Sequence, residues 1–260
     1  MRGSGACEGA RSVPEETAVA IVLNGTTHAV MMATPADLED FALGFALSDG
    51  IVAAAAEITA QEIVVRPEGI EARLWLSEAR AEAVAARRRA MTGPVGCGLC
   101  GIESLAEALR PLPPVGEGTT LGMADVDRAV TGLAAAQVLN ARTSAVHAAG
   151  LFLPGRGIVL TREDVGRHNA LDKLIGAMVR NGVDGSGGAI VITSRVSIEM
   201  VQKCAMAGVP VLIAVSAPTA HALRLAEAAG ITIVAIARGD GFEIFTHPKR
   251  IARGEQTDVA

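Results

Sequence analysis

The sequence predicts an α/β fold in which a layered α/β domain, about residues 120–250, follows a smaller N-terminal α+β subdomain. The main observation is a set of apolar runs separated by helical segments, which is typical of buried parallel strands with crossover helices. These runs are Gly157–Leu160, Ala189–Ile192, Pro210–Val215 and Ile231–Ile236. A hairpin signal near the N-terminus and a proline cluster between the two halves support the same division.

The first half is predicted to contain two hairpins and several helices. Thr17–Leu23 and His28–Met32 have the pattern of strands joined by the turn Asn24-Gly25, a strong hairpin signal. Pro35 is expected to open a helix, because proline is favoured in the first helical turn. One face of this helix would carry Leu38, Phe41, Ala42 and Phe45. The other expected elements are a hairpin of Ile63–Arg66 and Ile70–Leu76, a helix at Glu78–Ala90 and a short helix ending at Arg110.

The second half has its clearest helix at His168–Val179, where apolar residues recur at helical spacing. The next two helical segments end in glycine, at Gly208 and Gly230, directly before a strand. Prolines 111, 113 and 114 mark the boundary between an N-terminal subdomain, 17–115, and an α/β domain, 116–250. A leader, 1–16, is expected to be disordered, and within a tail, 251–260, the segment Gly254–Ala260 is expected to be unstructured.

Composition limits the classes of function. The chain has 260 residues and a formal net charge of −5, which argues against a general nucleic-acid binder. The apolar runs are too short to span a membrane, and the N-terminus lacks the apolar segment of a secretory signal. The sequence therefore predicts a soluble, cytoplasmic protein.

A glycine-rich loop with two thiols is the most informative stretch of the chain. Cys97 and Cys100 lie among Gly93, Gly96, Gly98 and Gly101. Glycine gives the backbone conformational freedom, so the loop should be mobile and should let another molecule approach the sulfur atoms. Cys-x-x-Cys spacing tends to lower a thiol pKa, and the thiolate is the nucleophile. The loop indicates sulfur or redox chemistry, or half of a metal site.

The remaining cysteines argue against a zinc site. Cys7 and Cys204 have no second thiol or histidine at ligand spacing, whereas a structural zinc site usually needs two such pairs. Cys204 falls in a helical run, where a buried, unreactive thiol is expected. We therefore predict no metal ligands in this chain.

The ends of the predicted parallel strands carry a second candidate site, because ligands of open α/β sheets bind beyond the carboxyl ends of the strands. Arg162, Arg195 and Arg238 each follow one of these strands. Ser216 or Thr219 could cap a helix whose N-terminal amides face the same rim. These groups suit a phosphate or pyrophosphate. The alternative is that the arginines pair with Glu163, Asp164 and Asp240 on a solvated rim.

Two histidines have weaker signals. His147 lies in a segment similar to the His-x-Glu motif of zinc deaminases, but Ala149 replaces the catalytic glutamate. His168 is expected to bond Asp172, one helical turn further on, as readily as to take part in catalysis.

The ordered motifs together resemble the FdhD family of formate dehydrogenase accessory sulfurtransferases. The similarity extends from about Leu38 to Arg250, and its most specific part is the Thr161–Lys173 signature. The other matching segments are Gly96–Gly101, Ser194–Met200 and Phe245–Arg250. One departure is Ser144-Ala145, where Gly-Gly is more usual.

The resemblance implies a sulfur carrier that accepts sulfane sulfur from a cysteine desulfurase. It would pass this sulfur to the molybdenum cofactor of formate dehydrogenase, bis-molybdopterin guanine dinucleotide, and GDP should act as a mimic of that cofactor. Cys97 is similar in position to the persulfide-bearing residue, and Cys100 to its helper. The scaffold is expected to be similar to that of cytidine deaminases. The implied cofactor-binding segment is Ile236, Ala237, Arg238, Gly239, Asp240 and Gly241.

Two other functions stay open from the residues alone. One is a non-catalytic protein that binds the molybdenum cofactor and hands it over, and the other is a dithiol oxidoreductase. The sequence leaves the oligomeric state open, and a homodimer is compatible with it.

Overall fold

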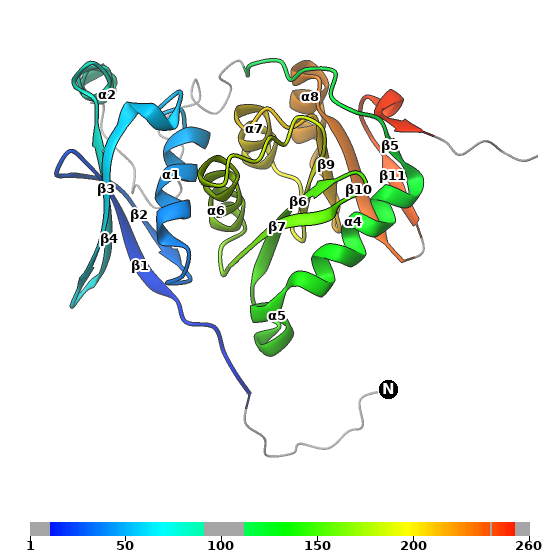
Figure 1. Ribbon diagram of the computed structural model, residues 1–260, viewed down its shortest axis with the longest axis horizontal. Helices are drawn as coiled ribbons and strands as arrows, with labels where there is room; N and C mark the ends of the chain where they lie inside the picture. The colour runs from blue at the N-terminus through cyan, green and yellow to red at the C-terminus, as the bar shows by residue number, and fades with distance from the viewer. Residues whose placement is uncertain (1–10, 91–111, 240, 253–260) are drawn as a thin grey trace, which may run out of the picture.

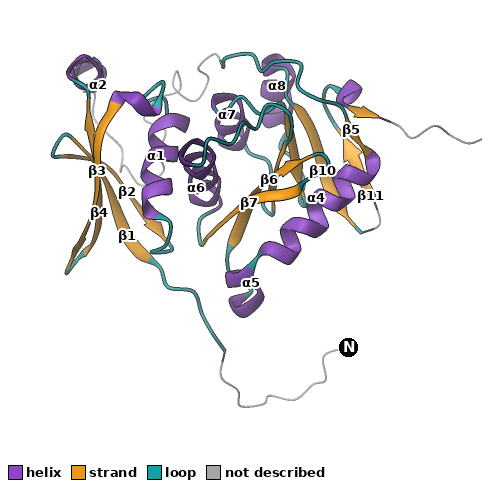
Figure 2. Ribbon diagram, viewed as in Figure 1, coloured by secondary structure: helices purple, strands orange, loops and turns teal. Residues whose placement is uncertain are grey.

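Two main β-sheets form the frame of the protein, one in each half of the chain (Figure 1). The computed structural model describes residues 11–90, 112–239 and 241–252. Figure 2 shows a sheet with helices on one side in the N-terminal half and a sheet between helices in the C-terminal half. A mixed α/β fold is therefore confirmed. None of the helices in these ranges is long and apolar enough to cross a membrane.

The N-terminal sheet has the strand order β2-β1-β4-β3. Its strands are β1 (Thr17–Leu23), β2 (Thr26–Ala33), β3 (Ile58–Arg66) and β4 (Gly69–Leu76), with the 3₁₀ turn η1 (Ala55–Glu57) before β3. Both predicted hairpins are confirmed. Asn24 and Gly25 have φ angles of 47° and 79°, as a tight hairpin turn requires. Helix α2 (Glu78–Ala90) follows β4 with the predicted bounds.

Helix α1 (Leu38–Ser48) covers one face of this sheet and begins three residues later than we predicted. Asp37 has a left-handed conformation, with φ of 54°, and a helix cannot extend back through such a residue. Pro35 therefore lies in a turn before the helix. The predicted apolar face is confirmed in part: Phe41 and Ala42 are fully buried, Leu38 is buried, and Phe45 is partly buried against the same core.

The C-terminal sheet has the strand order β11-β10-β9-β8-β6-β7. Its strands are β6 (His147–Leu153), β7 (Gly157–Asp164), β8 (Ala189–Ile192), β9 (Val211–Ala214), β10 (Thr232–Arg238) and β11 (Gly241–Ile244). The interpretation of Gly157–Leu160 as a buried parallel strand was wrong, because β7 pairs antiparallel with β6 at the edge of the sheet. A tight turn with φ of 73° at Gly155 and 76° at Gly157 joins the two strands. Among the described strands of this sheet, β8, β9 and β10 are the ones that pair in parallel with one another.

Helices cover both faces of this sheet (Figure 1). Helix α4 (Met123–Ala136), which we did not predict, packs on one face, and α5 (Val138–Thr143) follows it. The opposite face carries α6 (Arg167–Arg180), α7 (Ile198–Met206) and α8 (Ala220–Ala229). The predicted glycine ends are confirmed by φ angles of 68° at Gly208 and 75° at Gly230. The short strands β5 (Leu121–Gly122) and β12 (Ile251–Ala252), the latter after the 3₁₀ turn η2 (Pro248–Arg250), pair with each other.

The two halves meet where α1 crosses α6 without side chains between the backbones. A Cβ atom added at Gly44 would lie 1.7 Å from the Asp172 carbonyl oxygen, and one added at Gly176 would lie 1.9 Å from the Asp40 carbonyl oxygen. Both glycines are needed because only hydrogen fits at this crossing.

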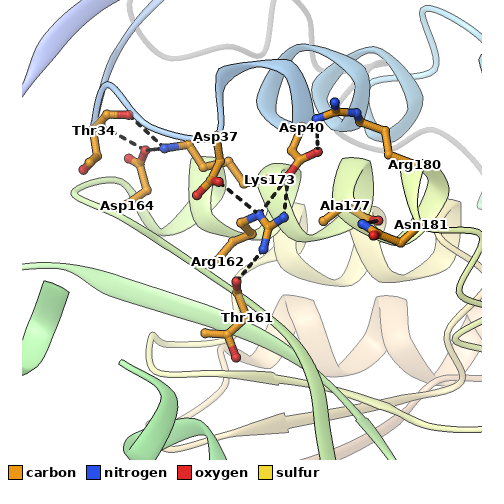
Figure 3. Close-up of polar contacts among 10 residues, drawn as sticks. All are labelled: Thr34, Asp37, Asp40, Thr161, Arg162, Asp164, Lys173, Ala177, Arg180 and Asn181. Carbon is orange, nitrogen blue, oxygen red and sulfur yellow. Dashed lines mark hydrogen bonds and ion pairs between the residues drawn. The ribbon is translucent and has the colours of Figure 1, made fainter. Parts of the chain in front are cut away.

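A buried ion pair lies beside this crossing (Figure 3). Lys173 Nζ is 2.6 Å from Asp164 Oδ2, and both side chains are fully buried. Thr34, at the end of the N-terminal sheet, donates its N–H to Asp164 at 3.0 Å and accepts from Lys173 at 2.9 Å. The pair, whose two residues lie in the C-terminal half, is therefore bound to the N-terminal half through Thr34.

A second ion-pair cluster centres on Asp40 of α1 (Figure 3). Arg162 donates to Asp40 Oδ2 from Nε at 2.8 Å and from Nη2 at 2.6 Å. Arg180 donates to the other carboxylate oxygen at 2.8 Å. Asp40 is almost fully buried, so these arginines offset the cost of removing its charge from water.

The crossing predicts that Gly176→Ala destabilises the protein. Alanine favours a helix interior over glycine by about 1 kcal/mol, so an uncrowded site would become more stable. Overpacking at Gly176 should instead lower the free energy of unfolding by about 1–3 kcal/mol, measured by chemical denaturation. Gly187→Ala is the matched control, because its Cβ would meet no atom within 4 Å. Equal stability of both variants and the parent protein would show that the crossing is not tight.

The buried pair predicts a large loss of stability in Lys173→Met. Removing the ammonium leaves Asp164 without its charged partner in the interior, a change that costs about 3–5 kcal/mol. The double variant Asp164→Asn/Lys173→Met should recover a substantial part of this loss, because it leaves no buried charge. Chemical denaturation of the parent protein and of both variants checks both expectations. A double variant no more stable than Lys173→Met would contradict this account.

Candidate functional site at the carboxyl ends of the strands

The strands β7, β8, β9 and β10 end at the same edge of the six-stranded sheet. β6 is antiparallel to both β7 and β8, so β7 runs in the direction of the parallel strands. We use the name carboxyl edge for three segments at this side of the sheet. Thr193–Arg195 follows β8, Val215–Thr219 follows β9, and Ile236–Gly239 includes the last residues of β10. The predicted meeting of these strand ends is thereby confirmed.

Arg162 lies below this edge and contacts the other half of the protein. Arg162 and Ile192 of β8 both lie opposite Ala149 of β6. Arg162 is therefore inside β7 and not beyond its end. Its guanidinium binds Asp40, approaches Asp37 at 3.6 Å and donates to its neighbour's carbonyl. The structure therefore separates Arg162 from the other two arginines and gives it a role in joining the two halves.

Arg195 and Arg238 both lie exposed at the carboxyl edge. Arg238 Nε lies 3.4 Å from the Val215 carbonyl oxygen, and neither arginine has an acidic partner in the described ranges. Two of the three carboxylates that we considered as partners, Glu163 and Asp164, are bound elsewhere, and the third, Asp240, lies outside the described residues. Glu163 accepts from the first N–H groups of α5, at 2.7 and 2.8 Å, and Asp164 binds Lys173.

The helix cap that we expected at this edge is Thr219. Its hydroxyl accepts from the Ala222 N–H at 3.3 Å and so caps α8. Ser216 contributes through its backbone, because its carbonyl accepts from the Ile236 N–H at 3.2 Å. This hydrogen bond connects the ends of β9 and β10 close to the start of α8.

The segment implied as cofactor-binding has an unusual backbone. Ile236 has a φ of 54°, a left-handed conformation that β-branched residues rarely adopt. Ala237 is buried, and a Cβ atom added at Gly239 would meet nothing within 4 Å. Gly241 has a φ of 137°, which favours glycine. Asp240 lies outside the described residues.

His147 borders the edge at the start of β6. Burial lowers its pKa, and the nearby positive charges of Arg167 and His168 lower it further. Its Nδ1 atom lies 3.5 Å from the Thr193 hydroxyl oxygen. In the sequence His147 had only a weak motif signal, and Thr193 was indicated only as the first residue after a predicted strand.

His168 and Glu199 form a titratable pair at the edge. His168 Nε2 lies 3.8 Å from Glu199 Oε2. The histidine, and then the Ser197 hydroxyl at 2.6 Å, lower the pKa of Glu199 to about 2. The expected contact between His168 and Asp172 was wrong, because Asp172 faces α1 and α7, where it binds Ser48 and Lys203 at 2.5 and 2.7 Å.

The cysteines divide into two groups. Cys97 and Cys100 lie outside the described residues. Cys204 is fully buried in α7, and burial raises the pKa of its thiol far above the ordinary value, so it stays protonated and unreactive as predicted. Within the described ranges, no group of three or more His, Cys, Asp or Glu residues could hold a metal ion.

Comparisons with known proteins agree along almost the whole chain. Residues 14–252 match the model of the FdhD/NarQ family. A protein of Agrobacterium fabrum called sulfur carrier protein FdhD is 53% identical over 94% of this chain and 90% of its own length. The protein of that name from Brucella abortus is 56% identical over 96% of this chain and 93% of its own.

A solved structure shows the same fold. It is described as that of a formate dehydrogenase accessory protein from Desulfotalea psychrophila, and it is 30% identical with a TM-score of 0.73. The match covers 93% of this chain and 91% of the other. The family match and the two relatives indicate the same family as the motifs of the sequence. The chain belongs to the FdhD/NarQ family.

Proposed function

We propose that this chain is a sulfur carrier that serves formate dehydrogenase. The observation that carries the proposal is the family membership together with the glycine-rich Cys97-x-x-Cys100 segment. The name of the close relatives, sulfur carrier protein, supports the same role. We assign the sulfur-accepting function to Cys97 and an assisting function to Cys100.

The proposed transfer begins with a persulfide on a cysteine desulfurase. The Cys97 thiol loses its proton, and the thiolate attacks the outer sulfur of the donor persulfide. The donor's S–S bond breaks as a new S–S bond forms on Cys97. The donor cysteine leaves as a thiolate and takes up a proton, so no external oxidant or reductant is required.

The substrate that would receive this sulfur is bis-molybdopterin guanine dinucleotide, and we propose that the carboxyl edge binds its nucleotide part. Arg195 and Arg238 supply positive charge without acidic partners in the described ranges, and α8 begins beside them. The scaffold that presents this edge is proposed to be similar to that of cytidine deaminases. The cargo would then be held by its phosphates while the sulfur is delivered.

Mass spectrometry separates this proposal from its two alternatives. The purified protein would be incubated with a cysteine desulfurase and cysteine. A mass gain of one sulfur atom supports the carrier, whereas no gain favours a protein that only binds the cofactor. Reversible loss of two hydrogen atoms, without added sulfur, favours a dithiol oxidoreductase.

The thiol assignment predicts that Cys97→Ala abolishes maturation of formate dehydrogenase. Cys100→Ala should impair maturation less, because a neighbouring thiol assists attack or release but does not hold the sulfur. Formate dehydrogenase activity in cells carrying each variant is the measurement. Cys204→Ala is the control, because its thiol is buried and protonated. Full maturation by Cys97→Ala would overturn the sulfur-carrier proposal.

The nucleotide edge predicts binding of GDP that depends on Arg238. A charge-assisted hydrogen bond contributes about 1.5–3 kcal/mol, so Arg238→Ala should weaken GDP by roughly one to two orders of magnitude in isothermal titration. Arg238→Lys should restore only part of the affinity, because lysine lacks the planar fork of donors. Arg156→Ala, in the turn at the opposite end of β7, should bind GDP like the parent protein. Equal affinity in all of these proteins would mean that the edge is not the nucleotide site.

A further inference from the structure

The end of β10 changes the face to which its side chains point. Ile233 and Ala235 pack on the side of α6, α7 and α8, whereas Val234 packs on the side of α4. In a regular strand Ala237 would follow Ile233 and Ala235, because side chains alternate with a period of two. Ala237 instead packs with Val234 on the α4 side. One extra residue has therefore been inserted between Ala235 and Ala237.

Ile236 is that extra residue. The pairing with β11 passes from Ala235 opposite Glu243 to Arg238 opposite Gly241, which leaves one residue too many in β10. Ile236 absorbs it by adopting a φ of 54°. Its N–H donates to the Ser216 carbonyl at 3.2 Å, so the bulge is fixed to the end of β9. A bulge of this kind redirects the side chains that follow it.

The redirected side chain is Arg238. In an uninterrupted strand it would share the α4 face with Val234. After the bulge the alternation places it on the opposite face, where α8 begins at Thr219. Its contact with the Val215 carbonyl oxygen, at 3.4 Å, is consistent with this position. The left-handed conformation of Ile236 thus decides on which side of the sheet Arg238 lies.

We propose that Ile236 is a positioning residue, whose strained backbone holds Arg238 on the nucleotide-binding side of the carboxyl edge. The inference rests on the proposed function, because it assumes that this edge binds the guanine nucleotide. Ile236 acts through Arg238, so its effect on the ligand must disappear when Arg238 is absent. This dependence separates positioning from a general structural role.

The test is a double-mutant cycle on the full chain, read by isothermal titration with GDP. Ile236→Pro removes both features of the bulge, because proline fixes φ near −65° and has no N–H for Ser216. It should weaken GDP as much as Arg238→Ala does, about tenfold or more, and the double variant should be no weaker than Arg238→Ala alone. The matched control is Ile236→Pro combined with Arg195→Ala. Arg195 follows another strand, so there the two losses should multiply.

Ile236→Asn keeps the test decisive if the proline variant does not fold. Asparagine accepts the left-handed conformation and retains the N–H, so it should preserve most of the affinity. A folded Ile236→Asn protein that binds as weakly as Arg238→Ala would overturn the inference, because the isoleucine side chain itself would then be required. Losses that multiply for Ile236→Pro and Arg238→Ala would overturn it as well. A parent protein that does not bind GDP would overturn the proposed nucleotide edge, and the inference with it.

Discussion

The rest of the structure depends on the buried contact between Asp164, Lys173 and Thr34. Two charges without water are tolerable only when they are paired and their remaining hydrogen-bonding capacity is used. Asp164 meets this condition through the N–H groups of Thr34 and Gly166 and the Asn169 amide, and Lys173 meets it through the Thr34 carbonyl. Both charges belong to the C-terminal half, so a displacement of the N-terminal sheet would leave the pair intact but would remove its two hydrogen bonds to Thr34. The two halves are therefore held in one arrangement, and the Gly44–Gly176 crossing keeps α1 against α6 in the same position.

This joint also decides which charges remain at the carboxyl edge. The Thr161–Lys173 signature provides Arg162, Asp164, Asn169 and Lys173 to the contact between the halves, and it provides His168 to the edge. Glu163 and Asp164 are bound away from the edge, and Arg195 and Arg238 stay exposed there. In a protein with a formal net charge of −5, two exposed arginines at one edge of the sheet can attract an anionic ligand to that place. The charged residues that form the contact between the halves thus also influence which charges remain at the proposed ligand site.

Local patterns predicted the elements whose causes are local. The Asn24-Gly25 turn, the helix begun by His168 and the glycine ends at 208 and 230 all depend on residues close in sequence. The partner of β7 could not be predicted in this way, because an apolar run has the same appearance at the edge of a sheet as inside it. The bond from Asp172 to Ser48 and Lys203 connects distant segments, so helical spacing pointed to the wrong partner, His168. Of the candidate site, the sequence predicted the shared edge and its arginines, but the separation of Arg162 is a tertiary effect.

The bulge at Ile236 explains why the geometry of the carboxyl edge could not be predicted from the sequence. Arg238-Gly239-Asp240-Gly241 has the composition of a turn, because glycine accepts left-handed conformations without strain. The structure has a positive φ at Gly241 and a further one at Ile236, where a left-handed conformation costs of order 1–3 kcal/mol. Such a conformation persists only if the surroundings impose it, and here the burial of Ala237 on the α4 face and the bond to Ser216 do so. An isoleucine in a left-handed conformation conflicts with the preference of its side chain. Conflicts of this kind are expected at functional sites, where stability is not the only requirement.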